Sequence, residues 1–103
     1  MLRTTIILDL LKDKLGSDYR TSLTFGKGAN YIGSIRHRGG ILTDEMGLKA
    51  ADILGFPGEF IILSLAAERA IDDSTMFQLS ALAERHQPEK KHQMNLPLAM
   101  AAN

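Results

Sequence analysis

Apolar residues recur three and four positions apart through most of the chain, which is the spacing of helices with one buried face. This pattern predicts six helices, over about residues 3–15, 18–25, 29–38, 44–54, 58–71 and 74–86. The run Thr-Thr-Ile-Ile-Leu near the start also favours a strand, so a first strand remains an alternative to the first helix. We therefore predict an all-α fold, a compact bundle of five to six short helices.

The stretch from Asp18 to Arg38 contains the residues that two short helices need when they cross steeply over a tight turn. Ser22 is small enough to let the helices approach, and Gly26 accepts the positive φ at which the first of them ends. Ile32 and Ile35, three residues apart, give the second helix an apolar inner side. This set predicts a helix-turn-helix, an arrangement whose second helix can enter the major groove of DNA.

The same spacing assigns inner residues and caps to the other predicted helices. The expected core residues are Ile7, Leu10, Leu11, Leu15, Tyr19, Phe25, Leu48, Ala51, Leu54, Met76, Leu79, Leu82 and Ala83. Thr4 or Thr5, Ser17 and Thr43 stand where N-caps are expected. Residues 1–87 are then one domain, and residues 88–103, after the last predicted helix, are expected to form a flexible tail.

The helix predicted over residues 58–71 is apolar almost all round. Such a helix is buried on more than one side, either as the central helix of the core or against a partner. We expect a homodimer whose interface lies within residues 56–86.

Charge is distributed unevenly although its sum is zero. Residues 1–40 hold seven Lys and Arg and three Asp, a balance of +4, whereas residues 41–87 hold three basic and eight acidic residues, a balance of −5. A polyanion is therefore attracted to the first part of the chain and repelled by the second.

The composition argues against several other classes of function. The chain has no cysteine, which excludes disulfides and thiolate metal sites and fits a reducing cytoplasm. No apolar run reaches the roughly 18 residues of a membrane span. His37, His86 and His92 are scattered, and no spacing of serine, histidine and acidic residues indicates a catalytic set. We therefore expect no enzyme activity, no metal and no cofactor.

The helix order and the set Ser22, Gly26, Ile32 and Ile35 resemble the Xre/Cro-like, or lambda-repressor-like, helix-turn-helix regulators over about residues 6–71. A subfamily from phages and prophages is similar in the segments Ile32-Gly33-Ser34-Ile35-Arg36, Thr43-Asp44-Glu45, Leu48-Lys49-Ala50-Ala51, Leu54-Gly55 and Ala66-Ala67-Glu68-Arg69. Three residues depart from the family pattern: Thr21 replaces an aliphatic residue, Ser22 an alanine, and Lys27 a valine or isoleucine.

The resemblance implies that the helix over residues 29–38 lies in the major groove, where Asn30 can pair with adenine and Ser34 can bond several bases. It also implies that phosphates are held by basic residues and by the amides that start the preceding helix. The residues expected to contact DNA are Ser17, Asp18, Lys27, Ala29, Asn30, Tyr31, Gly33, Ser34, Arg36, His37 and Arg38.

The expected function is that of a sequence-specific transcriptional regulator, a phage or prophage repressor that binds a palindromic operator as a dimer in the cytoplasm of a bacterial host. The alternative is a protein-interaction module on the same scaffold, such as an antirepressor or immunity factor, without specific DNA binding. The acidic, apolar second half of the chain and the zero net charge favour this alternative.

Overall fold

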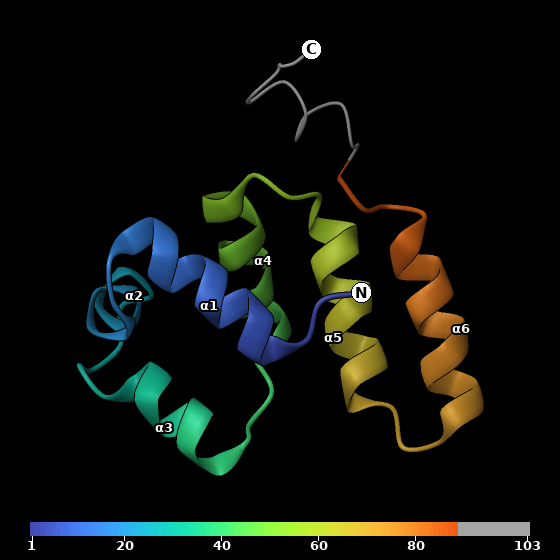
Figure 1. The fold of residues 1–103 in the computed structure, drawn as a ribbon, viewed down its shortest axis with the longest axis horizontal. Coiled ribbons are helices and arrows are strands. Elements are labelled where there is room, and N and C mark those ends of the chain that lie inside the picture. Colours follow the sequence, from blue (N-terminus) through green and yellow to red (C-terminus); the bar gives the residue numbers. More distant parts are fainter. Residues whose placement is uncertain (89–103) are drawn as a thin grey trace.

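The computed structural model describes residues 1–88 and contains six helices in that part of the chain (Figure 1). They are α1 (Thr4–Leu15), α2 (Asp18–Thr24), α3 (Tyr31–Arg38), α4 (Asp44–Leu54), α5 (Gly58–Arg69) and α6 (Asp73–Glu84). Residues 1–88 contain no strand, so the all-α prediction is confirmed, and the strand-prone run forms the first part of α1. The expected tail lies outside the described residues, except for Pro88.

The helices form two groups joined by α4. α1, α2 and α3 lie together at one end of the molecule, and α5 and α6 form a side-by-side pair at the other end (Figure 1). α4 contacts both α1 and α5. Because α5 has α4 on one side and α6 on the other, its nearly continuous apolar surface is used within the chain, as expected of a central core helix.

A single cluster of buried apolar side chains unites the described helices. Its members are Ile7, Leu8, Leu11, Phe25, Ile32, Ile35, Leu42, Met46, Ala50, Ala51, Phe60, Ile61, Leu65 and Ala83. α6 contributes only Ala83 to this cluster, so it is attached mainly through its contact with α5.

Three residues predicted for the core lie at the surface instead. Tyr19, Leu48 and Leu82 are 56%, 51% and 40% exposed. On α2 the inner side runs through Thr21 and Ser22, which leaves Tyr19 on the outer side. A spacing of three or four residues fits more than one face of a short helix, and tertiary packing selects the face that is buried.

Gly47 shows how that selection works on α4. A Cβ at this position would lie 2.5 Å from Cδ1 of Leu65 and 3.3 Å from Cγ2 of Ile61, two fully buried residues of α5. The close approach of α4 to α5 therefore requires a residue without a Cβ. The side of α4 that carries Gly47 faces inward, and Leu48 is left outside.

Three helix ends differ from the predicted ones by two residues, and the simplest is that of α6, which ends at Glu84 rather than at residue 86. α3 begins at Tyr31 rather than Ala29, because Ala29 and Asn30 form a turn in which the Tyr31 N–H donates to the Gly28 carbonyl over 3.1 Å. α5 ends at Arg69, since Ala70 has an extended backbone with a ψ of 139°.

Two of the predicted N-caps are present. The Ser17 hydroxyl accepts the Arg20 N–H over 3.0 Å at the start of α2, and the Thr43 hydroxyl accepts the Met46 N–H over 3.2 Å at the start of α4. Each cap satisfies one of the donors that the first turn of a helix leaves unpaired.

The predicted cap of α1 is wrong, because neither Thr4 nor Thr5 caps the helix and Glu68 of α5 takes that place. One Glu68 carboxylate oxygen accepts both the N–H and the hydroxyl of Thr4, each over 2.8 Å. The Thr4 hydroxyl oxygen in turn accepts the Leu42 N–H over 3.2 Å. This chain of hydrogen bonds ties the start of α1, the segment after α3 and the end of α5 together.

Glu68→Ala should lower the free energy of unfolding by about 1–2 kcal/mol, because two donors at the start of α1 lose their acceptor. Glu68→Gln retains an acceptor oxygen and should restore part of the loss. Glu59→Ala, which removes an exposed carboxylate from the same helix, should cost no more than about 0.5 kcal/mol. Denaturant unfolding at constant pH measures the three values, and equal losses for the two alanine variants would contradict the cap.

Candidate nucleic-acid interface

α2 and α3 are joined by a short connection that turns at Gly26. Gly26 has a φ of 74°, which glycine adopts at little cost, and its N–H donates to the Leu23 carbonyl over 2.9 Å. The Lys27 N–H donates to the Ser22 carbonyl over 3.0 Å. The structure therefore has two short helices and a glycine turn where the sequence predicts them.

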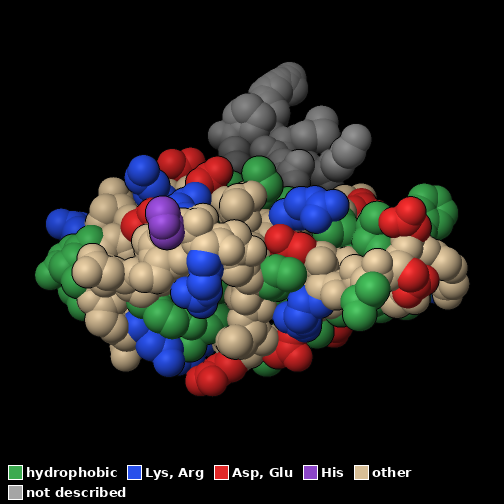
Figure 2. Space-filling model, turned by 90° about the horizontal axis from the view of Figure 1, so that it is seen from below, with side chains coloured by type: hydrophobic (Ala, Val, Ile, Leu, Met, Phe, Trp, Pro, Cys, Tyr) green, Lys and Arg blue, Asp and Glu red, His purple; other side chains and the backbone are tan. Residues whose placement is uncertain are grey.

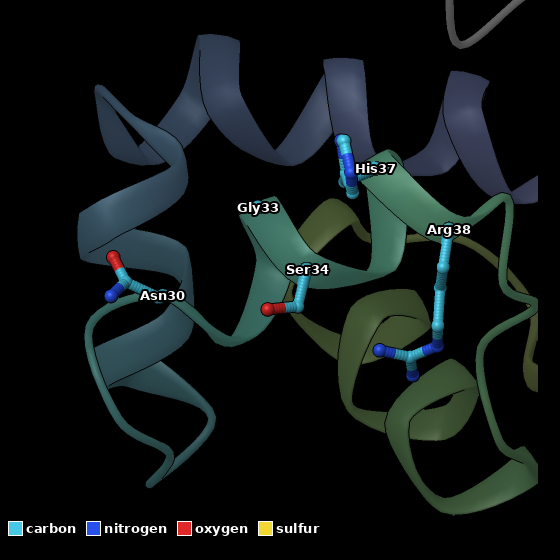
Figure 3. A pocket seen from close by; sticks show the side chains of 5 residues that line it. All are labelled: Asn30, Gly33, Ser34, His37 and Arg38. Carbon is cyan, nitrogen blue, oxygen red and sulfur yellow. The ribbon is translucent and has the colours of Figure 1, made fainter.

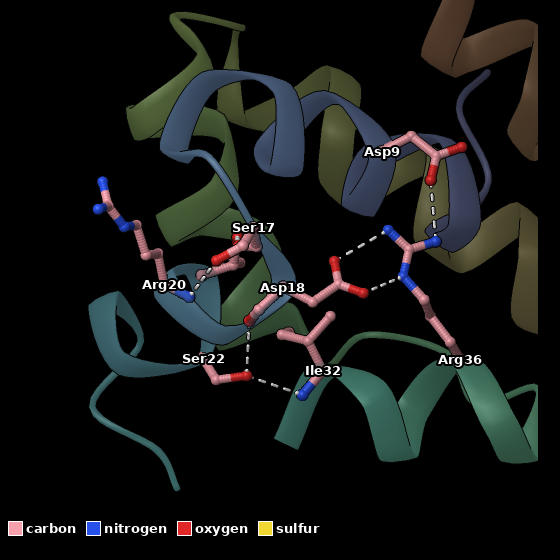
Figure 4. Close-up of polar contacts among 8 residues, drawn as sticks. Asp9, Ser17, Asp18, Arg20, Ser22, Ile32 and Arg36 are labelled. Carbon is pink, nitrogen blue, oxygen red and sulfur yellow. Dashed lines mark hydrogen bonds and ion pairs between the residues drawn. The ribbon is translucent and has the colours of Figure 1, made fainter. Parts of the chain in front are cut away.

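Ser22 fastens α3 to α2. Its fully buried hydroxyl donates to the Asp18 carbonyl over 2.9 Å and accepts the Ile32 N–H over 3.0 Å (Figure 4). The Ile32 N–H belongs to the first turn of α3, where a helix supplies no acceptor of its own. An alanine at this position could not accept this N–H, so the Ser22 hydroxyl adds a bond between the helices.

Thr21 and Lys27, on either side of the turn at Gly26, are also accommodated. Thr21 is fully buried, and its hydroxyl donates to the Ser17 carbonyl over 2.9 Å. Lys27 is exposed, and its Nζ lies 5.4 Å from the centre of the Tyr31 ring, a distance that allows a cation–π contact. Neither residue places an unpaired polar side-chain atom in the interior.

Arg36 joins α3 to carboxylates of α1 and α2 (Figure 4). Its Nε and Nη2 donate to the Asp18 carboxylate over 2.8 and 3.2 Å, and its Nη1 lies 2.8 Å from the Asp9 carboxylate. The hydrogen bond to Asp18 raises the pKa of Arg36; partial burial opposes this rise and Asp9 adds to it. An arginine is protonated at every pH near neutrality, so the shift itself does not make stability depend on pH in that range.

The outer side of α3 is polar and open. Asn30, Gly33, Ser34, His37 and Arg38 line an open depression of about 540 Å³ there, and all five residues are exposed (Figure 3). Ser34 and Arg38, four residues apart, extend to the same side of the helix, and Asn30 stands just before its start (Figure 3). The structure thus brings five of the predicted contact residues together on one surface.

The other predicted contact residues lie beside or behind this surface. Ala29 and Lys27 are exposed in the connection before α3, and Tyr31 is half-buried. The hydroxyl of Ser17 is used as the cap of α2, and the side chains of Asp18 and Arg36 are engaged with each other. A contact of these last three residues with DNA stays a prediction.

Sequence reasoning missed two residues near this site. Arg20 extends from α2 into solvent (Figure 4), and no ion pair of its guanidinium is found within residues 1–88. Its position as a basic residue in the first turn of the predicted helix 18–25 could have indicated a role in this site. Asp9 was not predicted as the partner of Arg36, because the two residues are far apart in the sequence and meet only through the packing of α1 on the α2–α3 pair.

The charges on this side of the molecule are dispersed. Figure 2 views the molecule from below Figure 1, the side on which α3 lies, and Lys and Arg side chains stand in separate places among polar and backbone atoms. Acidic side chains occur on the same face (Figure 2). Attraction of a polyanion therefore comes from separate cations over α1–α3 rather than from one continuous basic patch.

No protein-family model, curated protein or solved structure matches the chain. Within the described part of the chain, no three His, Cys, Asp or Glu side chains gather where they could hold a metal ion. The helices of residues 1–88 are also all too short or too polar to cross a bilayer. The function must therefore be inferred from the geometry and chemistry of the α3 surface.

Ser22→Ala should lower the free energy of unfolding by about 1–3 kcal/mol, because the buried Ile32 N–H loses its acceptor. Thr24→Ala is the matched control, since the exposed Thr24 hydroxyl makes only the bond to the carbonyl four residues earlier, over 2.8 Å. Its loss should change stability by no more than about 0.5 kcal/mol. Thermal or denaturant unfolding measures both, and a neutral Ser22→Ala would show that the helix junction does not depend on this bond.

Proposed function

We propose that the protein is a DNA-binding regulator and that α3 enters the major groove of double-stranded DNA. The observation that carries this proposal is the exposed polar side of α3, where Asn30, Ser34 and Arg38 line one open depression. The opposite side is fixed in the body of the protein by Ile32 and Ile35. The major groove is wide enough to admit a helix presented in this way.

The residues of this side have different roles in the proposal. The Asn30 amide can donate to and accept from the major-groove edge of adenine, and the Ser34 hydroxyl can bond several bases. Arg38, at the end of α3, and Arg20, on α2, hold phosphates, which fixes the position of the protein but reads no sequence. For Arg36 the proposal departs from the expectation based on the sequence: because its guanidinium is bonded to Asp9 and Asp18, it is assigned the positioning of α3 and no DNA contact.

We further propose that two copies associate through the α5–α6 end, so that two α3 helices read a two-fold symmetric site. One helix in the groove buries little surface, and pairing of two modules raises selectivity. The supporting observation is a set of exposed apolar residues in and just before α6: Ile71, Phe77 and Leu82 are 102%, 74% and 40% exposed.

Duplex DNA of mixed sequence should bind the protein at low salt and dissociate as salt rises. With about six phosphate contacts per dimer, affinity should fall roughly 10³-fold between about 50 and 200 mM salt.

Arg38→Ala should weaken binding to all DNA sequences alike and reduce the slope of log affinity against log salt by about one per copy. Asn30→Ala should mainly reduce the preference for a selected sequence, by about 1–3 kcal/mol at one base pair. Fluorescence anisotropy over a salt series measures these effects.

Arg36→Ala is the control for a basic residue of the same helix that acts within the chain. It should lower the free energy of unfolding by about 1 kcal/mol, and the salt dependence of its DNA binding should remain that of the wild type.

Absence of wild-type binding to any duplex at low salt would reject the proposal. The protein-interaction module would then be the better reading, with capture of a partner protein as its test.

Phe77→Ser should shift the protein from dimer to monomer, because it removes the largest exposed apolar side chain of α6 from the proposed interface. Leu23→Ser is the control, since Leu23 is an exposed apolar residue of α2 at the other end of the molecule. Sedimentation at micromolar concentration and physiological salt distinguishes the two states. A wild-type protein that sediments as a monomer would contradict dimerisation.

A further inference from the structure

Gly33 lies within α3 although nothing in the described fold requires glycine there. A Cβ built on Gly33 would meet no atom within 4 Å, and its φ is not among the positive values that favour glycine. Glycine within a helix is less favourable than alanine, because its backbone loses more conformational freedom on folding. The residue therefore lowers stability without a compensating contact in residues 1–88.

Gly47 and Gly33 both lie within helices, but only Gly47 is required by packing. At Gly47 a Cβ would lie 2.5 Å from a fully buried leucine, so that glycine is needed for the packing of α4 on α5. At Gly33 the space that a Cβ would occupy is open and belongs to the depression between Asn30, Ser34 and His37. The packing of residues 1–88 therefore does not account for glycine at this position of the helix.

Gly33 also brings the helix backbone to the surface of that depression. A ligand seated there meets the main chain of the first turn of α3. The N–H groups of Tyr31 and Ile32 are already bonded to Gly28 and Ser22, and no acceptor outside the helix is found for the Gly33 N–H within residues 1–88. Asn30 and Ser34 stand beside it as side-chain donors and acceptors (Figure 3). Such a surface suits a flat, polar edge that carries hydrogen-bond acceptors, as the edges of base pairs do in the major groove.

We propose that Gly33 is a specificity-determining residue: a base-pair edge of the operator packs directly on the α3 backbone at this position, closer than any residue with a Cβ would permit. This inference rests on the proposed DNA-binding function and assigns a role to one residue of that surface. In this proposal the absence of a Cβ favours sequence-specific binding and lowers stability, so adding a Cβ should change the two properties in opposite directions.

The experiment compares wild type with Gly33→Ala and Gly33→Ser on a duplex selected by the wild-type protein from random DNA, and on a duplex of unrelated sequence. Gly33→Ala should raise the Tm by about 4 °C or more. It should bind the selected duplex at least about tenfold more weakly and the unrelated duplex as the wild type does. Gly33→Ser should show a similar loss on the selected duplex. Ser80→Ala, on α6 far from α3, is the control for stabilisation without a change at the surface.

Four outcomes are distinguishable. A more stable Gly33→Ala with weaker selective binding, beside a Ser80→Ala that binds as the wild type, supports the inference. Unchanged affinity of Gly33→Ala for the selected duplex overturns it and leaves the proposed DNA binding intact. A lower Tm for Gly33→Ala also overturns it, because glycine would then be needed by the fold. A wild type that binds neither duplex overturns the proposed function, and the role of Gly33 with it.

Discussion

Burial of Ile32 and Ile35 sets the orientation of α3, and the character of its outer side follows from that orientation. The two side chains are 0% and 2% exposed. Removing each from water contributes about 1.5–3 kcal/mol, more than a typical single hydrogen bond. A rotation of α3 by one residue would expose one isoleucine and turn Gly33 or Ser34 inward. Apolar burial therefore decides which residues of α3 face solvent.

Apolar burial is not directional, so it does not fix the distance and tilt of α3 relative to α1 and α2. Two polar contacts fix them. The Ser22 hydroxyl meets the first turn of α3 at a fixed point, and Arg36 reaches Asp18 and Asp9 from the last turn. These two attachments lie near opposite ends of an eight-residue helix. A helix held at both ends presents its side chains in one geometry, which is what discrimination between base pairs requires.

The features that could be predicted from the sequence are those that depend on neighbouring residues. The helices, the turn at Gly26 and the caps at Ser17 and Thr43 follow from local spacing and local hydrogen bonds. The contribution of Glu68 to the start of α1 could not be predicted, because it depends on how α5 packs against α1. The outward position of Tyr19 has the same origin, since the buried side of α2 is chosen by its neighbours.

The same distinction applies to the candidate site. Its polar outer residues could be predicted, because they are the positions of α3 left over when the isoleucines are assigned inward. The ion pairs of Arg36 with Asp9 and Asp18 could not be predicted. A basic residue at the surface has the same sequence pattern whether it binds a phosphate or a carboxylate of its own chain.

The distribution of charge adds a constraint that neither the helices nor the site provides. Residues 1–40 carry a balance of +4 and form α1–α3, whereas residues 41–87 carry −5 and form α4–α6. α5 and α6 lie at the far end of the molecule from α2 and α3 (Figure 1). The proposed duplex would therefore be attracted to one end and repelled from the other. Zero net charge therefore does not oppose the proposed DNA binding, since the separation of opposite charges would favour an orientation with α3 toward the polyanion.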